Sequence, residues 1–263
     1  MGHENAEEEW RQVLAGEHPG VVSMRRTFRR IPAAPRCKLC HAPFAGPGGF
    51  VLRPWFGPWE RNAQLCKSCM RQLLKSGIGG AEVEITLLFA DIRGSTSLGE
   101  RLRPAEFSAV MSAFYRLGAQ SITDADGIVD KFVGDEVIGL FIPGYAGRDF
   151  AGRAITAGMA LIAAAGAADA TVNGPIPVGV GIHTGDAFVG TIGSSEQISD
   201  FTALGDTVNT TARLASLAAA GQMLVSSATI DRAGWPIAGS ERRTVEVRGR
   251  EGTLDVFAVP PTN

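Results

Sequence analysis

The stretch AEVEITLLFADIRGST, residues 81–96, sets the fold of the larger part of this chain. It is apolar at Val83 and Ile85 and continuously apolar from Leu87 to Phe89, a pattern that predicts a buried β-strand. The small residues that follow predict a turn that enters a helix. Asp91 is therefore expected at the end of a buried strand, beside a turn.

Downstream of this strand, helices and strands are predicted to alternate. The predicted elements are a helix over 104–120, a hairpin over 127–142 with Gly134 and Asp135 at its turn, a helix over 148–166, a strand over 177–185, a strand pair around Phe188 and Phe201, a helix from Thr207 to Leu217, and a final β pair near Arg243–Val247 and Thr253–Val259. The order strand, helix, hairpin, helix, strand indicates an α+β fold with a ferredoxin-like βαββαβ core and extra strands.

Composition excludes several classes of protein. With 263 residues, 45% of them hydrophobic and 20% charged, the chain can bury a sizeable core. Its net charge of −2 gives no overall surplus of positive charge for binding nucleic acid. The apolar runs 85–90 and 154–170 are too short or too rich in Ala and Gly for a transmembrane segment. No export signal precedes them, so we expect a cytoplasmic protein.

Three parts are expected along the chain. Residues 1–36 predict an N-terminal helix followed by a basic arm, residues 37–76 a four-cysteine metal-binding module, and residues 82–260 the α/β domain. Glycines at 77, 79 and 80 mark the linker between the last two parts.

The four cysteines form two CxxC pairs, and 25 residues separate the pairs. Cys37, Cys40, Cys66 and Cys69 present four thiolates, which suit tetrahedral Zn²⁺. An iron–sulfur cluster uses the same set of ligands and is the main alternative. The string CKLCH also matches a c-type haem attachment, but this reading requires export and leaves Cys66 and Cys69 unused.

Two carboxylates are predicted to converge at one edge of the sheet. If the hairpin lies beside the first strand, Asp135 approaches Asp91, and such a pair suits Mg²⁺ or Mn²⁺ bound together with substrate phosphates. The turn IRGST after Asp91, with Gly94, Ser95 and Thr96, offers backbone N–H groups to a triphosphate. Taken singly, Asp91 is better explained as a helix cap and Asp135 as a turn residue.

Three ordered motifs resemble the catalytic domain of class III nucleotidyl cyclases. They are LFADIRGST (88–96), KFVGDEV (131–137) and LGDTVNTTARL (204–214), and the resemblance covers about residues 82–259. It implies adenylate cyclase activity, with two Mg²⁺ or Mn²⁺ ions per active site. The implied residues are Asp91, Ile92 and Asp135 for these ions, Gly94, Ser95, Thr96, Arg248 and Arg250 for the phosphates, Asn209 for the ribose and Arg213 for transition-state charge.

The resemblance also bears on the base and on the assembly. Lys131 matches the adenine-reading lysine of the family, and Thr202 stands where many adenylyl cyclases place Asp, although a hydroxyl can still accept from the adenine amine. In this family the metal carboxylates meet the Lys, Asn and Arg set of the other chain. We therefore expect a homodimer with two shared sites that binds ATP, and no nucleic-acid partner.

Other functions remain open. A guanylate cyclase would be expected to carry an acid at Lys131. A silent, nucleotide-sensing cyclase domain should lack a metal aspartate or the arginine, and this chain lacks neither. A diguanylate-type cyclase shares the fold, but VGDEV (133–137) lacks its doubled glycine and the pair Asn209 and Arg213 has no place in it.

Overall fold

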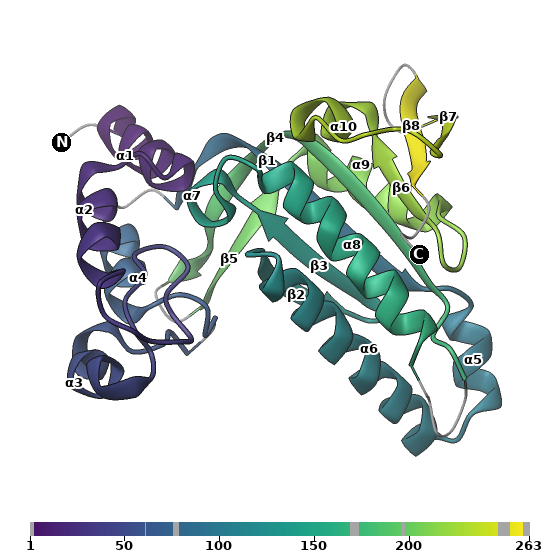
Figure 1. Ribbon diagram of the computed structural model, residues 1–263, viewed down its shortest axis with the longest axis horizontal. Coiled ribbons are helices and arrows are strands. Elements are labelled where there is room, and N and C mark those ends of the chain that lie inside the picture. The colour runs from purple at the N-terminus through teal and green to yellow at the C-terminus, as the bar shows by residue number, and fades with distance from the viewer. Residues whose placement is uncertain are drawn as a thin grey trace. The chain divides into compact units, whose positions relative to one another are not determined.

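The predicted buried strand is β1 (Gly80–Ile92), which lies within a mixed sheet. The computed structural model describes residues 3–60, 62–75, 79–168, 174–195, 198–246 and 253–259. Within these residues the sheet has eight strands in the order β2-β3-β1-β4-β6-β8-β7, and β5 pairs with β4 outside that path (Figure 1). The structure thus confirms the α+β class, and the sheet contains both parallel and antiparallel pairs.

The chain divides into two compact units. The cysteine unit comprises Met1–Val83, Ile142–Gly147 and Ala187–Leu204. The sheet unit comprises Glu84–Phe141, Arg148–Asp186 and Gly205–Asn263. Two short segments from the middle of the chain therefore pack with the N-terminal third.

The helices and the hairpin predicted for the sheet unit are present. The bounds are α6 (Pro104–Asp124), β2 (Ile128–Val133), β3 (Glu136–Phe141), α8 (Phe150–Gly166), α9 (Asp206–Leu217), β7 (Glu241–Glu246) and β8 (Thr253–Val259). In β1 the register pairs Asp91 with Glu136 of β3, so the hairpin lies beside the first strand as expected. Val247, placed in the last predicted pair, lies outside the described residues.

Helices cover both faces of β4 (Val178–Ser195). Gly158 of α8 lies against Val180 and Ile182, and Gly181, which points to the opposite face, lies against the backbone of Ala215 in α9. Side chains alternate between the faces of a strand, so α8 and α9 pack on opposite faces of β4. A Cβ on Gly181 would come within 2.2 Å of the Ala215 nitrogen, which is why a glycine is needed there.

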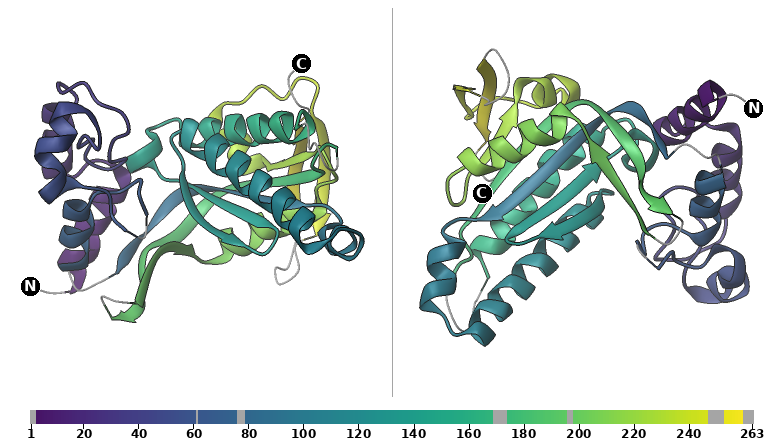
Figure 2. Two further views of the ribbon diagram at one scale, coloured as in Figure 1. Left: turned by 90° about the horizontal axis from the view of Figure 1, so that it is seen from below. Right: turned by 180° about the vertical axis from the view of Figure 1, so that it is seen from behind.

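Two sequence predictions about strands were wrong. β4 is one strand of 18 residues, whereas the sequence suggested a strand over 177–185 and a separate one at Phe188. Its later half pairs with β5 (Ile198–Leu204) in a long antiparallel hairpin (Figure 2). The prediction also missed β6 (Met223–Ser226) and α10 (Ser227–Ala233).

The N-terminal segment is more ordered than a solvated helix followed by an arm. It forms α1 (His3–Ala15) and α2 (Pro19–Phe28), which bury Trp10, Leu14 and Phe28. The cysteine unit also contains α3 (Gly46–Phe56), α4 (Lys67–Lys75) and α7 (Pro143–Ala146). No helix within the described ranges is long and apolar enough to cross a bilayer.

A close backbone contact joins α1 to α7. A Cβ on Gly144 would lie 2.4 Å from the Leu14 carbonyl oxygen, and one on Gly16 would lie 2.9 Å from the Gly144 Cα. Arg25 adds a bridge, because its Nε donates to the Leu39 carbonyl at 2.6 Å and its Nη2 donates to the Gly144 carbonyl. The helices before the first CxxC pair are thus fastened to α7.

Candidate active site and metal centre

The structure brings Asp91 and Asp135 together. Asp91 lies one residue from the end of β1, and Asp135 lies in the turn between β2 and β3. The backbone N–H of Ile92 donates to the Asp135 carbonyl at 3.3 Å, and the Ser95 hydroxyl donates to Asp135 Oδ2. The Ile92 side chain is a buried hydrocarbon without donor atoms, so Ile92 could serve a metal ion only through its backbone carbonyl.

The environment of Asp91 favours a cation. Burial raises its pKa to about 6; Arg93 opposes this shift, and Asp135 and Glu136 add to it. Asp91 Oδ2 accepts from Arg93, while the buried Oδ1 has no hydrogen-bond partner among the described residues. A buried carboxylate oxygen without a partner is costly unless a ligand meets it, so the pair fits a divalent ion.

Arg93 is a site residue that the sequence reasoning missed, although it stands inside the quoted turn. Besides Asp91 it contacts the Ser216 carbonyl through Nη1 at 3.0 Å, and its backbone N–H donates to the Pro177 carbonyl at 2.7 Å. It therefore fixes the turn after β1 and neutralises part of the carboxylate charge. The two-residue spacing from Asp91 was the signal that could have identified it.

The turn IRGST, which was predicted to bind a triphosphate, borders a cavity. Gly94 adopts a left-handed conformation with φ 70° and precedes α5 (Ser95–Arg101), whose first N–H groups follow. A cavity of about 380 Å³ lies beside it. The cavity is lined by Ser95, Thr96, Gly99, Phe107, Met111, Tyr115, Gly134 and Asp135. The loop residues and one metal carboxylate thus border the same space.

Asn209 and Arg213 share one face of α9, as their spacing predicted. Asn209 is exposed, and the buried Nε of Arg213 has no hydrogen-bond partner in the part of the chain that the structure describes. Within that part, neither side chain hydrogen-bonds or ion-pairs with Asp91 or Asp135. Arg93 nevertheless links Asp91 to α9, because it bonds both Asp91 and the Ser216 carbonyl.

The base-reading candidates lie in different units. Lys131 is on β2 of the sheet unit, where its Nζ lies 3.8 Å from Asp130 Oδ2. Thr202 is on β5 of the cysteine unit and is buried. Arg248 and Arg250, predicted to bind phosphate, lie outside the described residues. His183 is buried, with its Nδ1 2.8 Å from Ser226 Oγ.

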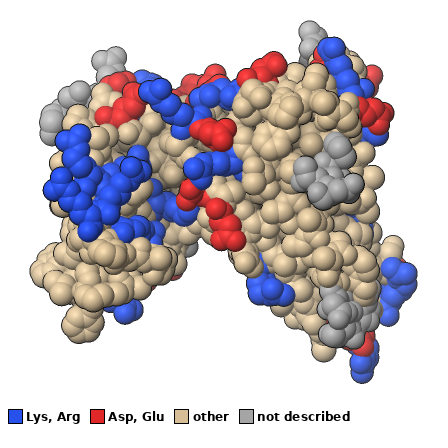
Figure 3. Space-filling view, viewed as in Figure 1, with Lys and Arg blue, Asp and Glu red and all other residues tan. Residues whose placement is uncertain are grey.

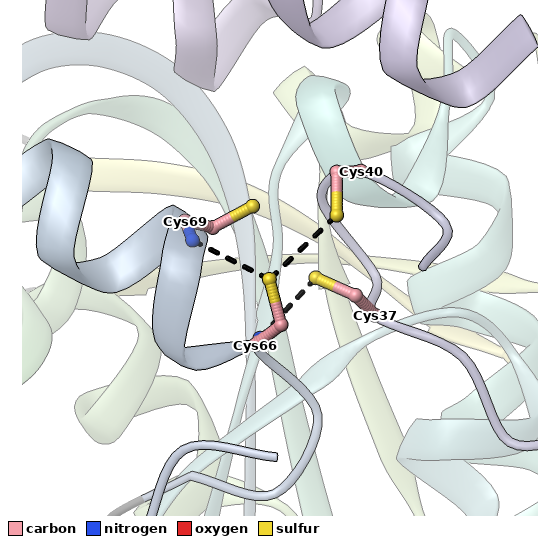
Figure 4. A group of neighbouring side chains, drawn as sticks. All are labelled: Cys37, Cys40, Cys66 and Cys69. Atoms are coloured by element: carbon pink, nitrogen blue, oxygen red, sulfur yellow. Dashed lines mark hydrogen bonds between the residues drawn. The ribbon is translucent and has the colours of Figure 1, made fainter. Parts of the chain in front are cut away.

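The four cysteines form a buried cluster (Figure 4). Their sulfur atoms all lie within 4.8 Å of one another, and Cys40 Sγ is 3.7 Å from Cys66 Sγ. A Zn–S bond of about 2.3 Å in a tetrahedron separates neighbouring sulfurs by roughly 3.8 Å. The backbone N–H of Cys69 donates to Cys66 Sγ at 3.3 Å, as expected for a thiolate held by a knuckle.

Because the four sulfur atoms lie so close together, their deprotonation is unfavourable without a bound cation. Hydrogen bonds with the neighbouring thiols raise the pKa of Cys40 and Cys69, and burial adds to both shifts. Four buried thiolates repel one another, so a bound cation is needed to hold them deprotonated together. The donor set therefore fits one soft metal ion.

Comparisons with known proteins match the sheet unit and the β4–β5 hairpin. The adenylate and guanylate cyclase catalytic domain matches residues 81–259. The adenylate cyclase of Anabaena cylindrica is 28% identical over 193 residues, which are 69% of this chain and 38% of that protein. Adenylate cyclase 1 of Rhizobium meliloti is 29% identical over 203 residues, 73% of this chain and 30% of that protein. The chain thus spans about a third of the length of these relatives.

Solved structures agree with these matches. A guanylyl cyclase crystal structure has 33% sequence identity and a TM-score of 0.65, covering 69% of this chain and 93% of that one. The adenylyl cyclase CyaB of P. aeruginosa has 26% identity and a TM-score of 0.62, covering 69% and 96%. Both base specificities therefore occur among proteins of comparable similarity.

Proposed function

The chain belongs to the adenylate and guanylate cyclase catalytic domain family, and we propose that it is an adenylate cyclase that converts ATP to 3′,5′-cyclic AMP and pyrophosphate. The partnerless Oδ1 of Asp91, buried beside Asp135, supports this function most directly. Divalent ions bound there would acidify the ribose 3′-hydroxyl and neutralise charge on the triphosphate.

Residues of the chain bind the phosphates, orient the ribose and stabilise the transition state. The N–H groups at the start of α5 hold phosphate oxygens at the edge of the cavity. The ribose 3′ oxygen loses its proton to solvent and attacks the α-phosphorus, and the bond to pyrophosphate breaks. Asn209 orients the ribose, and Arg213 stabilises the charge that develops on the phosphoryl oxygens. Arg248 and Arg250 remain candidates for binding the phosphates.

We infer that the site is completed by a second chain. Among the described residues of one chain, no hydrogen bond or ion pair joins the acids to Asn209 or Arg213, and a head-to-tail homodimer would bring Asp91 and Asp135 of one protomer to the α9 pair of its partner. Two equivalent sites result from this arrangement.

The test of the function is the product formed from each nucleotide. With Mg²⁺ or Mn²⁺, we expect ATP to give 3′,5′-cyclic AMP and pyrophosphate faster than GTP gives its cyclic product. Lys131→Glu should lower kcat/KM for ATP about tenfold or more, because the donor to adenine N1 is replaced by an acceptor. Chromatography of both reactions gives the rates. Faster turnover of GTP by the unaltered protein would make it a guanylate cyclase, and no product from either nucleotide would favour a silent nucleotide sensor.

We further propose that the cysteine cluster binds one Zn²⁺ ion per chain. A single ion accounts for sulfurs that all lie within 4.8 Å, whereas the thiolates of an iron–sulfur cluster bind different irons and spread farther apart. The cluster is also the core of a segment too small to fold on its own.

Removal of a ligand should unfold this part of the cysteine unit. Cys66→Ser is expected to lose the zinc and to lower the free energy of unfolding by several kcal/mol, because metal binding and folding are coupled. Elemental analysis and thermal unfolding measure both effects. Ser68 lies between the ligands Cys66 and Cys69, so Ser68→Ala is the matched control. This variant should keep its metal. Iron together with inorganic sulfide in the native protein would instead show that the four cysteines hold an iron–sulfur cluster.

We propose that the same cluster also influences nucleotide binding through Thr202 of its own unit. The ring of buried Tyr145 in α7 is close enough to Cys69 and Cys37 for their charge to raise its pKa, after the larger effect of burial. That ring packs against Phe201, the neighbour of Thr202, with centroids 6.3 Å apart. Loss of the metal would thereby disturb the β5 strand that carries Thr202. We therefore expect the KM for ATP to change in Cys66→Ser.

A further inference from the structure

Positive charge is concentrated in one part of the cysteine unit. Residues 18–59 contain seven lysines and arginines and no aspartate or glutamate, in a chain whose net charge is −2. The basic residues are Arg25, Arg26, Arg29, Arg30, Arg36, Lys38 and Arg53. Among the described residues, no carboxylate forms an ion pair with exposed Arg26, Arg30 or Arg53. This positive charge is available to an external anion.

The same part of the unit exposes large apolar side chains. Phe50, Val51 and Trp55 of α3 have exposed fractions of 85%, 64% and 60%. At about 100° per residue they fall within an arc of roughly 140° on one side of the helix. Such exposure is unusual for neighbouring aromatic and aliphatic residues and marks an interaction site.

Packing holds the charged and apolar residues on adjoining helices. Phe28 of α2 meets Phe56 of α3 edge to face, with ring centroids 5.1 Å apart. Figure 3 shows a group of Lys and Arg side chains over α2, next to an uncharged surface where Figure 1 draws α3. We call this surface the basic-apolar face. Its members are Arg26, Arg29, Arg30, Arg53, Phe50, Val51 and Trp55.

We propose that the basic-apolar face docks the chain on an anionic lipid bilayer. The arginines meet lipid phosphates, and the exposed side chains of α3 insert among the headgroups, where aromatic rings lie favourably. The helix sequence GPGGFVLRPWF contains one charged residue, Arg53, among apolar and aromatic side chains, which suits an apolar boundary. The chemistry of the cyclase site plays no part in this binding.

The test is binding of the full chain to vesicles. We expect sedimentation with phosphatidylcholine vesicles that contain about 30% phosphatidylserine, none with pure phosphatidylcholine, and release when NaCl rises from about 0.1 to about 0.5 M. Arg26→Gln with Arg30→Gln should weaken binding about 25-fold, about fivefold for each charge removed. Phe50→Ser with Trp55→Ser should weaken it tenfold or more.

Matched controls lie in the sheet unit. Arg116→Gln with Arg148→Gln removes the same charge from exposed positions of that unit, and Ile237→Ser removes an exposed apolar side chain. Both should bind vesicles like the unaltered chain.

Three results would overturn the proposal. One is no binding to anionic vesicles, or equal losses in the controls. Another is tighter binding to a single-stranded oligonucleotide than to anionic vesicles, weakened by Arg26→Gln with Arg30→Gln, which assigns the face to nucleic acid. The third is concentration-dependent self-association that the same variant abolishes while vesicles are not bound, which assigns it to a second copy.

Discussion

Asp135→Asn is expected to lower kcat for cyclic nucleotide formation by about a thousandfold, the loss of several kcal/mol of metal-assisted stabilisation. Asparagine keeps the size of the side chain and an acceptor for the Ser95 hydroxyl, so the turn between β2 and β3 should keep its structure. The charge that holds a divalent ion beside Asp91 is lost. Steady-state rates at saturating Mn²⁺, together with Mn²⁺ binding by calorimetry, measure the effect.

A distant carboxylate provides the comparison. Asp124, exposed at the end of α6 in the same unit, can be replaced by asparagine with the same loss of charge. Asp124→Asn should retain activity and bind Mn²⁺ normally. A loss of less than tenfold in Asp135→Asn, with Mn²⁺ binding intact, would show that the two aspartates do not form the metal site.

Mixing two inactive variants should restore activity. Arg213→Ala is expected to reduce kcat by a factor of roughly 10² to 10³ and to change KM less, because its contact strengthens in the transition state. When Asp135→Asn and Arg213→Ala chains exchange subunits at equal concentration, half of the dimers are mixed and each mixed dimer has one intact site. The mixture should reach about a quarter of the unaltered activity.

In the control mixture, both variants are altered in the acidic residues of the site. Asp91→Asn and Asp135→Asn impair the same half of each site, so their mixture leaves no intact site and should stay inactive. If Asp135→Asn and Arg213→Ala together give no more than the sum of their separate rates, the acids and the arginine act within a single chain.

The sequence predicted the strand that carries Asp91 and the hairpin that carries Asp135, because both have strong apolar periodicity around a turn. It failed at β4, where glycines suggested that the strand ends. Gly181 lacks a side chain where α9 packs directly against the strand. A Cβ on Gly190 would lie 1.8 Å from the backbone of Gly79. Such requirements come from neighbouring elements, and a local pattern cannot reveal them.

The candidate site was predictable to the extent that its motifs are contiguous. Asp91 and Asp135 meet because two strands pair, which the order of elements implied. The contribution of Arg93 and the link from the cysteine cluster through Tyr145 to Phe201 depend on tertiary packing. In α2, Val21 and Phe28 form a buried face at a helical spacing, which the prediction of a basic arm did not include.

The close approach of Gly144 to the end of α1 makes the N-terminal third inseparable from the rest of the chain. A shortened protein that begins at residue 81 would uncover the α7 turn and the buried Tyr145, and both would then face water. Removal of these residues is therefore a poor way to learn their role, and point substitutions at the cysteines and at the contacts with α7 are more informative.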